Sequence, residues 1–169
     1  MFLNELSGKA VTGVVHFYNK TPANWYCRKQ STTETATYGS KFLACQTCFK
    51  QIIDHMQYLW YLGAPVYKTD YAWGDNDAMI NSATIPDAKL HKRHSILSFH
   101  FVRSLIACGY INLQHLEWEC NIANILTKHW GYHKVRTNWS VQSFIPEEML
   151  PPCTLTIHKK LTATLLHRN

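Results

Sequence analysis

The sequence of 169 residues predicts an α/β domain. Three observations support this prediction: a β-hairpin near the start, a long amphipathic helix after it, and two later strands, each followed by a helical segment. Apolar content of 46% and aromatic content of 13% are typical of a folded chain and argue against a disordered one. The length suits one domain with a sizeable core.

The hairpin is predicted from two segments rich in β-branched and aromatic residues. Residues 11–18 form the first strand and residues 24–29 the return strand. Between them lie residues 19–23, where Asn19 and Pro22 are typical turn residues. An antiparallel pair is therefore expected at the start of the chain.

A long helix is predicted next. The Ser31-Thr32-Thr33-Glu34 segment has the spacing of a capping box, which indicates a helix start nearby. Apolar residues then recur at steps of three and four, namely Phe42, Cys45, Phe49, Ile52, Ile53, Met56, Leu59 and Trp60. Gly63 is expected to end the helix.

The remaining elements follow in alternation. They are a strand over residues 66–73 that leads to Asp75, a basic turn over 89–94, a helix over about 95–108, a strand over 110–116 and a last helix over 121–128. The segment after the strand thus carries a carboxylate, Asp75.

Composition limits the partners and the compartment. Seventeen basic and eleven acidic residues give a net charge of +6, a mild bias toward polyanions. Neither a signal peptide nor an apolar run of membrane-spanning length is visible, so no membrane partner is expected. The six cysteines are then expected to be reduced, inside a cell, in the cytoplasm or nucleus.

Several motifs in order resemble the ribonuclease H domain of copia-type retrotransposon Pol polyproteins. They read Trp25-Tyr26-Cys27-Arg28-Lys29-Gln30-Ser31-Thr32, Asp75-Asn76, Lys92-Arg93-His94, His100-Phe101-Val102-Arg103 and Ala123-Asn124-Ile125-Leu126-Thr127-Lys128. The resemblance covers about residues 7–131, which we take as a ribonuclease-H-like domain within residues 1–131. Residues 132–169 form a divergent C-terminal extension, with a linker, a possible strand over 153–157 and a possible helix over 159–167.

The resemblance implies a mixed five-stranded sheet with flanking helices and hydrolysis of RNA in RNA–DNA hybrids. Two Mg²⁺ ions clamp the scissile phosphate in such enzymes, and four carboxylates hold the ions. Here Asp75 occupies one ligand position and would be the remaining metal ligand, whereas Lys41 and Asn124 occupy two others. The fourth ligand, an Asp on the first strand, has no counterpart, because residues 1–6 contain no Asp. We therefore expect impaired catalysis and no tight binding of Mg²⁺.

Other residues carry alternative interpretations. His94 corresponds to a position near the family's active site, and the candidates for nucleic-acid contacts are Arg28, Lys29, Asn76, Lys89, Lys92, Arg93 and Arg103. An ordinary solvated basic face explains these charges equally well. Glu34, Asp77, Glu117 and Glu119 are the carboxylates that could compensate in a working nuclease. Cys45 and Cys48 have metal-like spacing, but their place in the apolar stripe favours packing.

The family's first strand lies at the centre of the sheet, and here it is expected to be truncated or missing. Residues 1–6, residues 153–157 or a strand-donating protein partner could fill its place, because unpaired strand edges are costly. Three functions stay open: a working nuclease with rearranged ligands, a non-catalytic nucleic-acid-binding module, and a structural subunit or decayed gene product.

Overall fold

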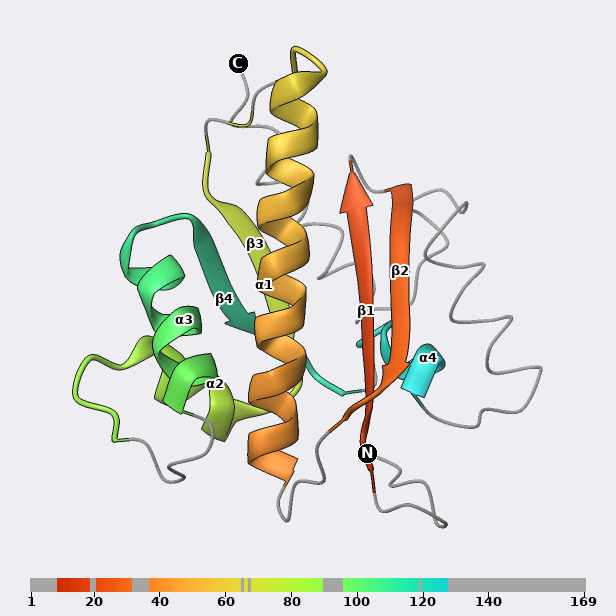
Figure 1. Cartoon of the computed structure of the whole chain (residues 1–169). Helices are drawn as coiled ribbons and strands as arrows, with labels where there is room; N and C mark the ends of the chain where they lie inside the picture. The colour runs from red at the N-terminus through yellow and green to blue at the C-terminus, as the bar shows by residue number, and fades with distance from the viewer. Residues whose placement is uncertain are drawn as a thin grey trace, which may run out of the picture.

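The computed structural model describes residues 9–18, 21–31, 37–64, 66, 68–89, 96–118 and 120–127. The elements in these ranges are β1 (Val11–Tyr18), β2 (Thr21–Lys29), α1 (Thr37–Tyr61), β3 (Asp70–Gly74), α2 (Asp77–Thr84), α3 (Ile96–Ala107), β4 (Ile111–His115) and α4 (Asn124–Thr127) (Figure 1). The predicted α/β class is confirmed. Predictions for residues 1–6 and 128–169 fall outside the described residues.

The hairpin has the predicted antiparallel pairing. Val11 pairs with Lys29, and the register slips by one residue between His16 and Phe17. Phe17 faces Pro22, which has no N–H to donate to a ladder, so an irregularity is expected there. The return strand therefore begins at residue 21, three residues before the predicted start.

Helix α1 ends as predicted but buries less of its stripe. Gly63 adopts φ 75°, and the amides of Gly63 and Ala64 donate to the carbonyls of Trp60 and Leu59, which is the expected C-terminal cap. Phe42 and Phe49 are fully buried, whereas Trp60 is 62% exposed. Trp60 continues the apolar stripe but stays exposed, because the last turns of α1 extend past the elements that cover its middle (Figure 1).

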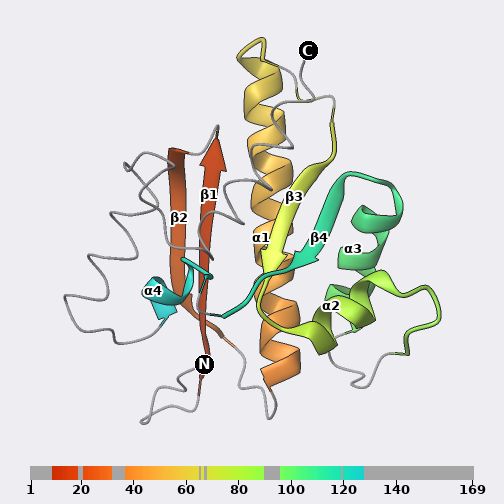
Figure 2. The ribbon, with the colours of Figure 1, turned by 180° about the vertical axis from the view of Figure 1, so that it is seen from behind.

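The second half of the described chain is a parallel strand pair with helical crossovers. β3 pairs with β4 in parallel, with Asp70 opposite Ile111. Helix α2 was not predicted, and it lies in the connection between β3 and β4 together with α3 (Figure 2). The Asn76 side chain caps it by accepting from the amide of Met79 at 2.8 Å.

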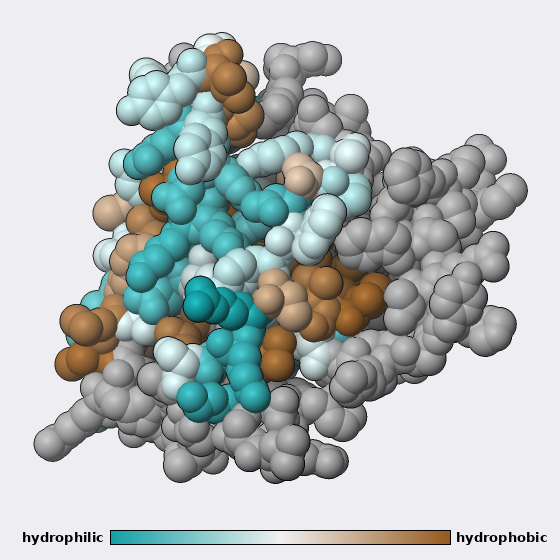
Figure 3. Space-filling view, turned by 45° about the vertical axis from the view of Figure 1, so that its right-hand side comes forward, coloured by the Kyte–Doolittle hydropathy of each residue, from teal (hydrophilic) through white to brown (hydrophobic). Residues whose placement is uncertain are grey.

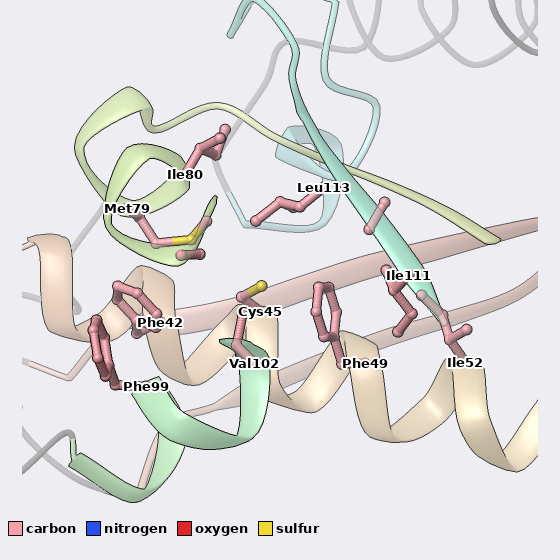
Figure 4. Packing of buried hydrophobic residues seen from close by; sticks show 12 residues of the cluster. Phe42, Cys45, Phe49, Ile52, Met79, Ile80, Phe99, Val102, Ile111 and Leu113 are labelled. Carbon is pink, nitrogen blue, oxygen red and sulfur yellow. The ribbon is translucent and has the colours of Figure 1, made fainter. Parts of the chain in front are cut away.

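The main core lies where α1 packs against β3, β4, α2 and α3 (Figure 4). Phe49 and Val102 are each fully buried there, and Ile111 is 1% exposed. Alternate residues of β1, among them Val14 and His16, are also buried, and β1 packs against α1. Helix α1 thus packs on both strand pairs and sets their relative position.

The described strands form two separate two-stranded sheets, β1–β2 and β3–β4, instead of the single mixed sheet that was expected. Among the described residues no strand lies between β1 and β3, so each pairs on one edge only. Helix α1 lies across the two strand pairs and connects them (Figures 1 and 2). The coarse α/β architecture holds without a continuous sheet.

Candidate functional site

Asp75 lies at the carboxyl end of β3, immediately before the cap of α2. Its side chain is 11% exposed. The neighbouring Asn76 has extended backbone geometry, with φ −127°, and spends its side-chain oxygen on the first turn of α2. Asn76 therefore orients the segment that carries Asp75. Its predicted contact with nucleic acid stays a prediction.

Lys41 reaches Asp75 from the second turn of α1. Its ammonium group donates a hydrogen bond to Oδ1 of Asp75 and forms an ion pair with that carboxylate. The Lys41 side chain is 26% exposed, so the pair is partly shielded from water. Charge-assisted hydrogen bonds of this kind are about twice as strong as neutral ones. The carboxylate of Asp75 is thus already paired with a cationic side chain of the same protein.

Other carboxylates do not gather around Asp75 in the described part of the chain. Asp77 is 73% exposed and lies 3.4 Å from Nε2 of His115. Glu117 is exposed. No group of three or more His, Cys, Asp or Glu residues that could hold a metal ion occurs among the residues described. Glu34 and Glu119 fall outside those residues.

Asn124 begins α4 and is 5% exposed. Its amide nitrogen donates to the carbonyl of Trp118, and its backbone amide donates to the carbonyl of Asn121 at 3.0 Å. Asn121 in turn accepts from the amide of Ala123 at 3.0 Å. The side chain of Asn124 is thereby engaged in holding the turn that leads into α4.

Lys41 and Asn124 line the same cavity, of about 60 Å³. Its walls come from β1, from Gln30 just after β2, from the first turns of α1 and from the segment of α4. The structure therefore brings together Lys41 and Asn124, two of the residues that the resemblance singled out. Asp75 does not line the cavity, but its ion pair with Lys41 connects it to the residues that do.

Gln30 is the residue of this cavity that sequence reasoning missed. It is 7% exposed, and its amide nitrogen donates to the hydroxyl of Thr12 and to the carbonyl of Ser40, each at 2.9 Å. Its Oε1 is buried and has no hydrogen-bond partner among the described residues. A buried acceptor left unpaired costs about 1–3 kcal/mol. The available signal was a glutamine directly after a predicted strand, which is too common to single out.

The predicted nucleic-acid contacts lie in different places. Arg28, Lys29 and Lys89 are exposed. The guanidinium of Arg103 donates to the carbonyls of three residues at the end of α2, namely Ser82 and Ile85 at 2.8 Å each and Pro86 at 2.6 Å. It also lies 5.0 Å from the ring centre of Phe99. Arg103 thus caps the C-terminal end of α2 by binding its last carbonyl groups. Lys92, Arg93 and His94 lie outside the described residues.

Cys45 and Cys48 both lie against the apolar stripe of α1. Burial raises the pKa of the Cys45 thiol well above its usual value, and burial raises the pKa of Cys48 to about 12. A thiol must lose its proton to bind a metal, so these groups are poor ligands at neutral pH. The raised pKa of both thiols agrees with the packing interpretation of this pair.

Comparisons of the chain with known protein families, with curated proteins and with solved structures gave no match. Among the helices of the described residues, none combines the length and the apolar character needed to cross a bilayer.

Proposed function

We propose that this chain is a ribonuclease-H-like domain of copia-type retroelement origin that has lost efficient hydrolysis of RNA–DNA hybrids. The observation that carries the proposal is the ion pair between Lys41 and Asp75. A two-metal centre needs several carboxylates around two divalent ions. At the corresponding place this chain has one carboxylate, and an ammonium group is bonded to it.

The order of the elements supports the origin. A hairpin, a long helix, a strand, a helical crossover, a parallel strand and a short helix follow one another as the resemblance implies. The described strands form two separate pairs. A missing central strand would leave this division.

Cleavage of a labelled RNA–DNA hybrid tests the proposal. With Mg²⁺ or Mn²⁺ the protein is expected to cleave no faster than the hybrid alone. The double variant Lys41→Glu/Asn124→Asp restores two carboxylates, and we expect little or no recovery because the first-strand carboxylate is still missing. Metal-dependent cleavage that Asp75→Asn abolishes would instead establish a working nuclease with rearranged ligands, and would overturn the proposal.

A nucleic-acid-binding role without chemistry is favoured by the net charge of +6 and by the exposed Arg28, Lys29 and Lys89. Phosphate contacts make affinity fall steeply with salt. We expect hybrid binding that weakens when Arg28 and Lys29 are both changed to Gln, and again when Lys92 and Arg93 are changed. Arg103→Gln is no suitable probe, because its guanidinium closes α2. Binding indifferent to both double variants removes this role.

A strand-accepting interaction role is favoured by β1 and β3, which each pair on one edge only among the described residues. Exposed strand edges are templates for another strand. A protein partner that supplies one would slow amide hydrogen exchange along β1 in the purified complex. Exchange along β1 that is already slow in the isolated chain would remove the need for a partner.

A further inference from the structure

Two histidines, His16 of β1 and His55 of α1, meet where the hairpin packs against the long helix. We propose that this pair is a pH-sensitive latch, which holds the far end of the hairpin on α1 at neutral pH and releases it in acid. The far end consists of residues 16–18 of β1 and residues 21–24 of β2. The latch is independent of hybrid cleavage. Its support comes from two hydrogen bonds, from the contact between the rings, and from the different contacts at the other end of the hairpin.

At the far end, a histidine hydrogen bond joins each strand of the hairpin to α1. Nε2 of His16 lies 3.0 Å from Oε1 of Gln51, and Nδ2 of Asn24 lies 3.2 Å from Nε2 of His55. An amide oxygen can only accept and an amide nitrogen can only donate. In this arrangement His16 therefore carries a proton on Nε2, whereas Nε2 of His55 is unprotonated. A charged His55 has N–H groups on both ring nitrogens, so it loses the bond from Asn24 as it stands here.

The two rings also touch each other. Their centres lie 4.6 Å apart, with the planes at 82°, and His16 is only 8% exposed. Like charges at this separation repel more strongly in a partly buried place than in water. Burial lowers the pKa of His16, the hydrogen bond to Gln51 opposes this, and the charge of His55 lowers the pKa further. The stability that the contact provides is therefore complete above pH 6.5 and is lost as the pH falls.

Other titratable groups surround the pair. The ring of Tyr18 lies 5.8 Å from that of His55, and burial together with the charge of Asp70 on β3 raises the pKa of Tyr18. Tyr26 is the titratable residue of β2 on the same face, and Asp54 is exposed next to His55 on α1. Helix α4, which also contacts β1, carries no titratable side chain. Among the described groups here, the two histidines are the ones whose ordinary pKa lies between about 5 and 8.

The other end of the hairpin is held by contacts without a titratable group. The Gln30 side chain donates to the carbonyl of Ser40 on α1 at 2.9 Å, and its backbone amide donates to the carbonyl of Ala10 at 2.8 Å. On the outer face, Gly13 packs so closely against Thr127 of α4 that a Cβ would lie 2.6 Å from its Cγ2. Acid should therefore free the far end of the hairpin while this end stays in place beside α1 (Figure 1).

Amide hydrogen exchange measured by NMR on the ¹⁵N-labelled full-length protein tests the latch. Protection factors, which correct for the pH dependence of the chemical exchange rate, are compared at pH 7.5 and pH 5.0. We expect the protection of amides in residues 16–18 to fall about tenfold in acid, the factor that one pKa unit of difference between released and docked forms produces. The protection of amides in residues 11–13 is expected to change by less than about twofold.

His55→Gln keeps a hydrogen-bonding side chain that cannot become charged, and His55 is only partly buried, so the variant is expected to fold. We expect its acid-induced fall in protection to be about twofold or less, as in His16→Gln. His115→Gln is the matched control, since His115 lies in β4 with its side chain 41% exposed, and it should keep the tenfold fall.

A fall that persists in His55→Gln would mean that His16 acts alone, and would overturn the proposal. An equal fall along the whole of β1 would mean global unfolding, and the absence of a fall in the unmodified protein would mean that no release occurs; either result also overturns it. Thermal unfolding at pH 7.5 confirms that each variant is folded. If His16→Gln does not fold, the result with His55→Gln decides.

Discussion

Replacing Lys41 by Met removes the ammonium group while keeping an unbranched side chain. Asp75, 11% exposed, then loses its cationic partner. Breaking a fully buried ion pair costs about 3–5 kcal/mol, and an exposed pair contributes about 0–1 kcal/mol. Because Lys41 is 26% exposed, the pair lies between these limits, and we expect a loss of about 2 kcal/mol. For a chain of this size that corresponds to a melting temperature lower by about 6 °C.

A double-mutant cycle measures the pair itself. Urea unfolding is followed for Lys41→Met, Asp75→Asn and the variant with both changes. We expect a coupling energy of about 1–2 kcal/mol, since the double variant no longer buries an unpaired charge. Gln57→Met, on an exposed position of the same helix, is the control and is expected to change stability by about 0.5 kcal/mol or less. A coupling energy near zero would refute the reasoning, because the two side chains would then act independently.

Three further predictions concern the packing around the site. Burial lowers the pKa of His16 below its usual 6.5. The stability that the neutral ring contributes is therefore complete above pH 6.5 and is lost as the pH falls through the lowered pKa. Urea unfolding midpoints should drop between pH 8 and pH 5, and His16→Gln should reduce that drop. Gly13→Ala would place a Cβ 2.6 Å from Cγ2 of Thr127, and calorimetry should show a destabilisation of about 1–3 kcal/mol. Phe49→Ala empties a fully buried position and should cost about 3–5 kcal/mol by urea unfolding, clearly more than the partly buried Phe101→Ala.

Local patterns predicted most of the element positions. The β-branched run gave β1 at residues 11–18, and helical periodicity with Gly63 gave the core of α1 and its end. Helix α2 was missed, because its eight residues are too few for a periodic signal. The Asn76 cap and Asp77 in the first turn were the signals that could have revealed it.

The separation into two strand pairs could not be derived from local patterns. Strand propensity predicts that residues 11–18 and 66–73 are extended, but it does not indicate which edges meet. Side-chain packing on both sides of α1 decides that arrangement. The end of α1 shows the same limitation, since Trp60 continues the stripe but lies beyond the elements that would bury it.

For the site, Lys41 and Asn124 were predicted as substituted ligand positions only through the resemblance stated in the sequence analysis. The structure adds the contact between Lys41 and Asp75 and the cavity shared by Lys41 and Asn124. Neither follows from spacing, because these residues are far apart in sequence. Arg103 was assigned to phosphate contacts from its charge, and only the three carbonyls it bonds to reveal its part in closing α2.

The central claim is that the ammonium group of Lys41 stands where a metal centre would need a free carboxylate. Paramagnetic broadening by Mn²⁺ tests it directly, through the backbone amide signals of Asp75 and Asn124 in the ¹⁵N-labelled protein. We predict no selective broadening at either amide when micromolar Mn²⁺ is added. Strong broadening confined to these two signals, and removed by Asp75→Asn, would mean that the site binds metal despite Lys41, and would contradict the account.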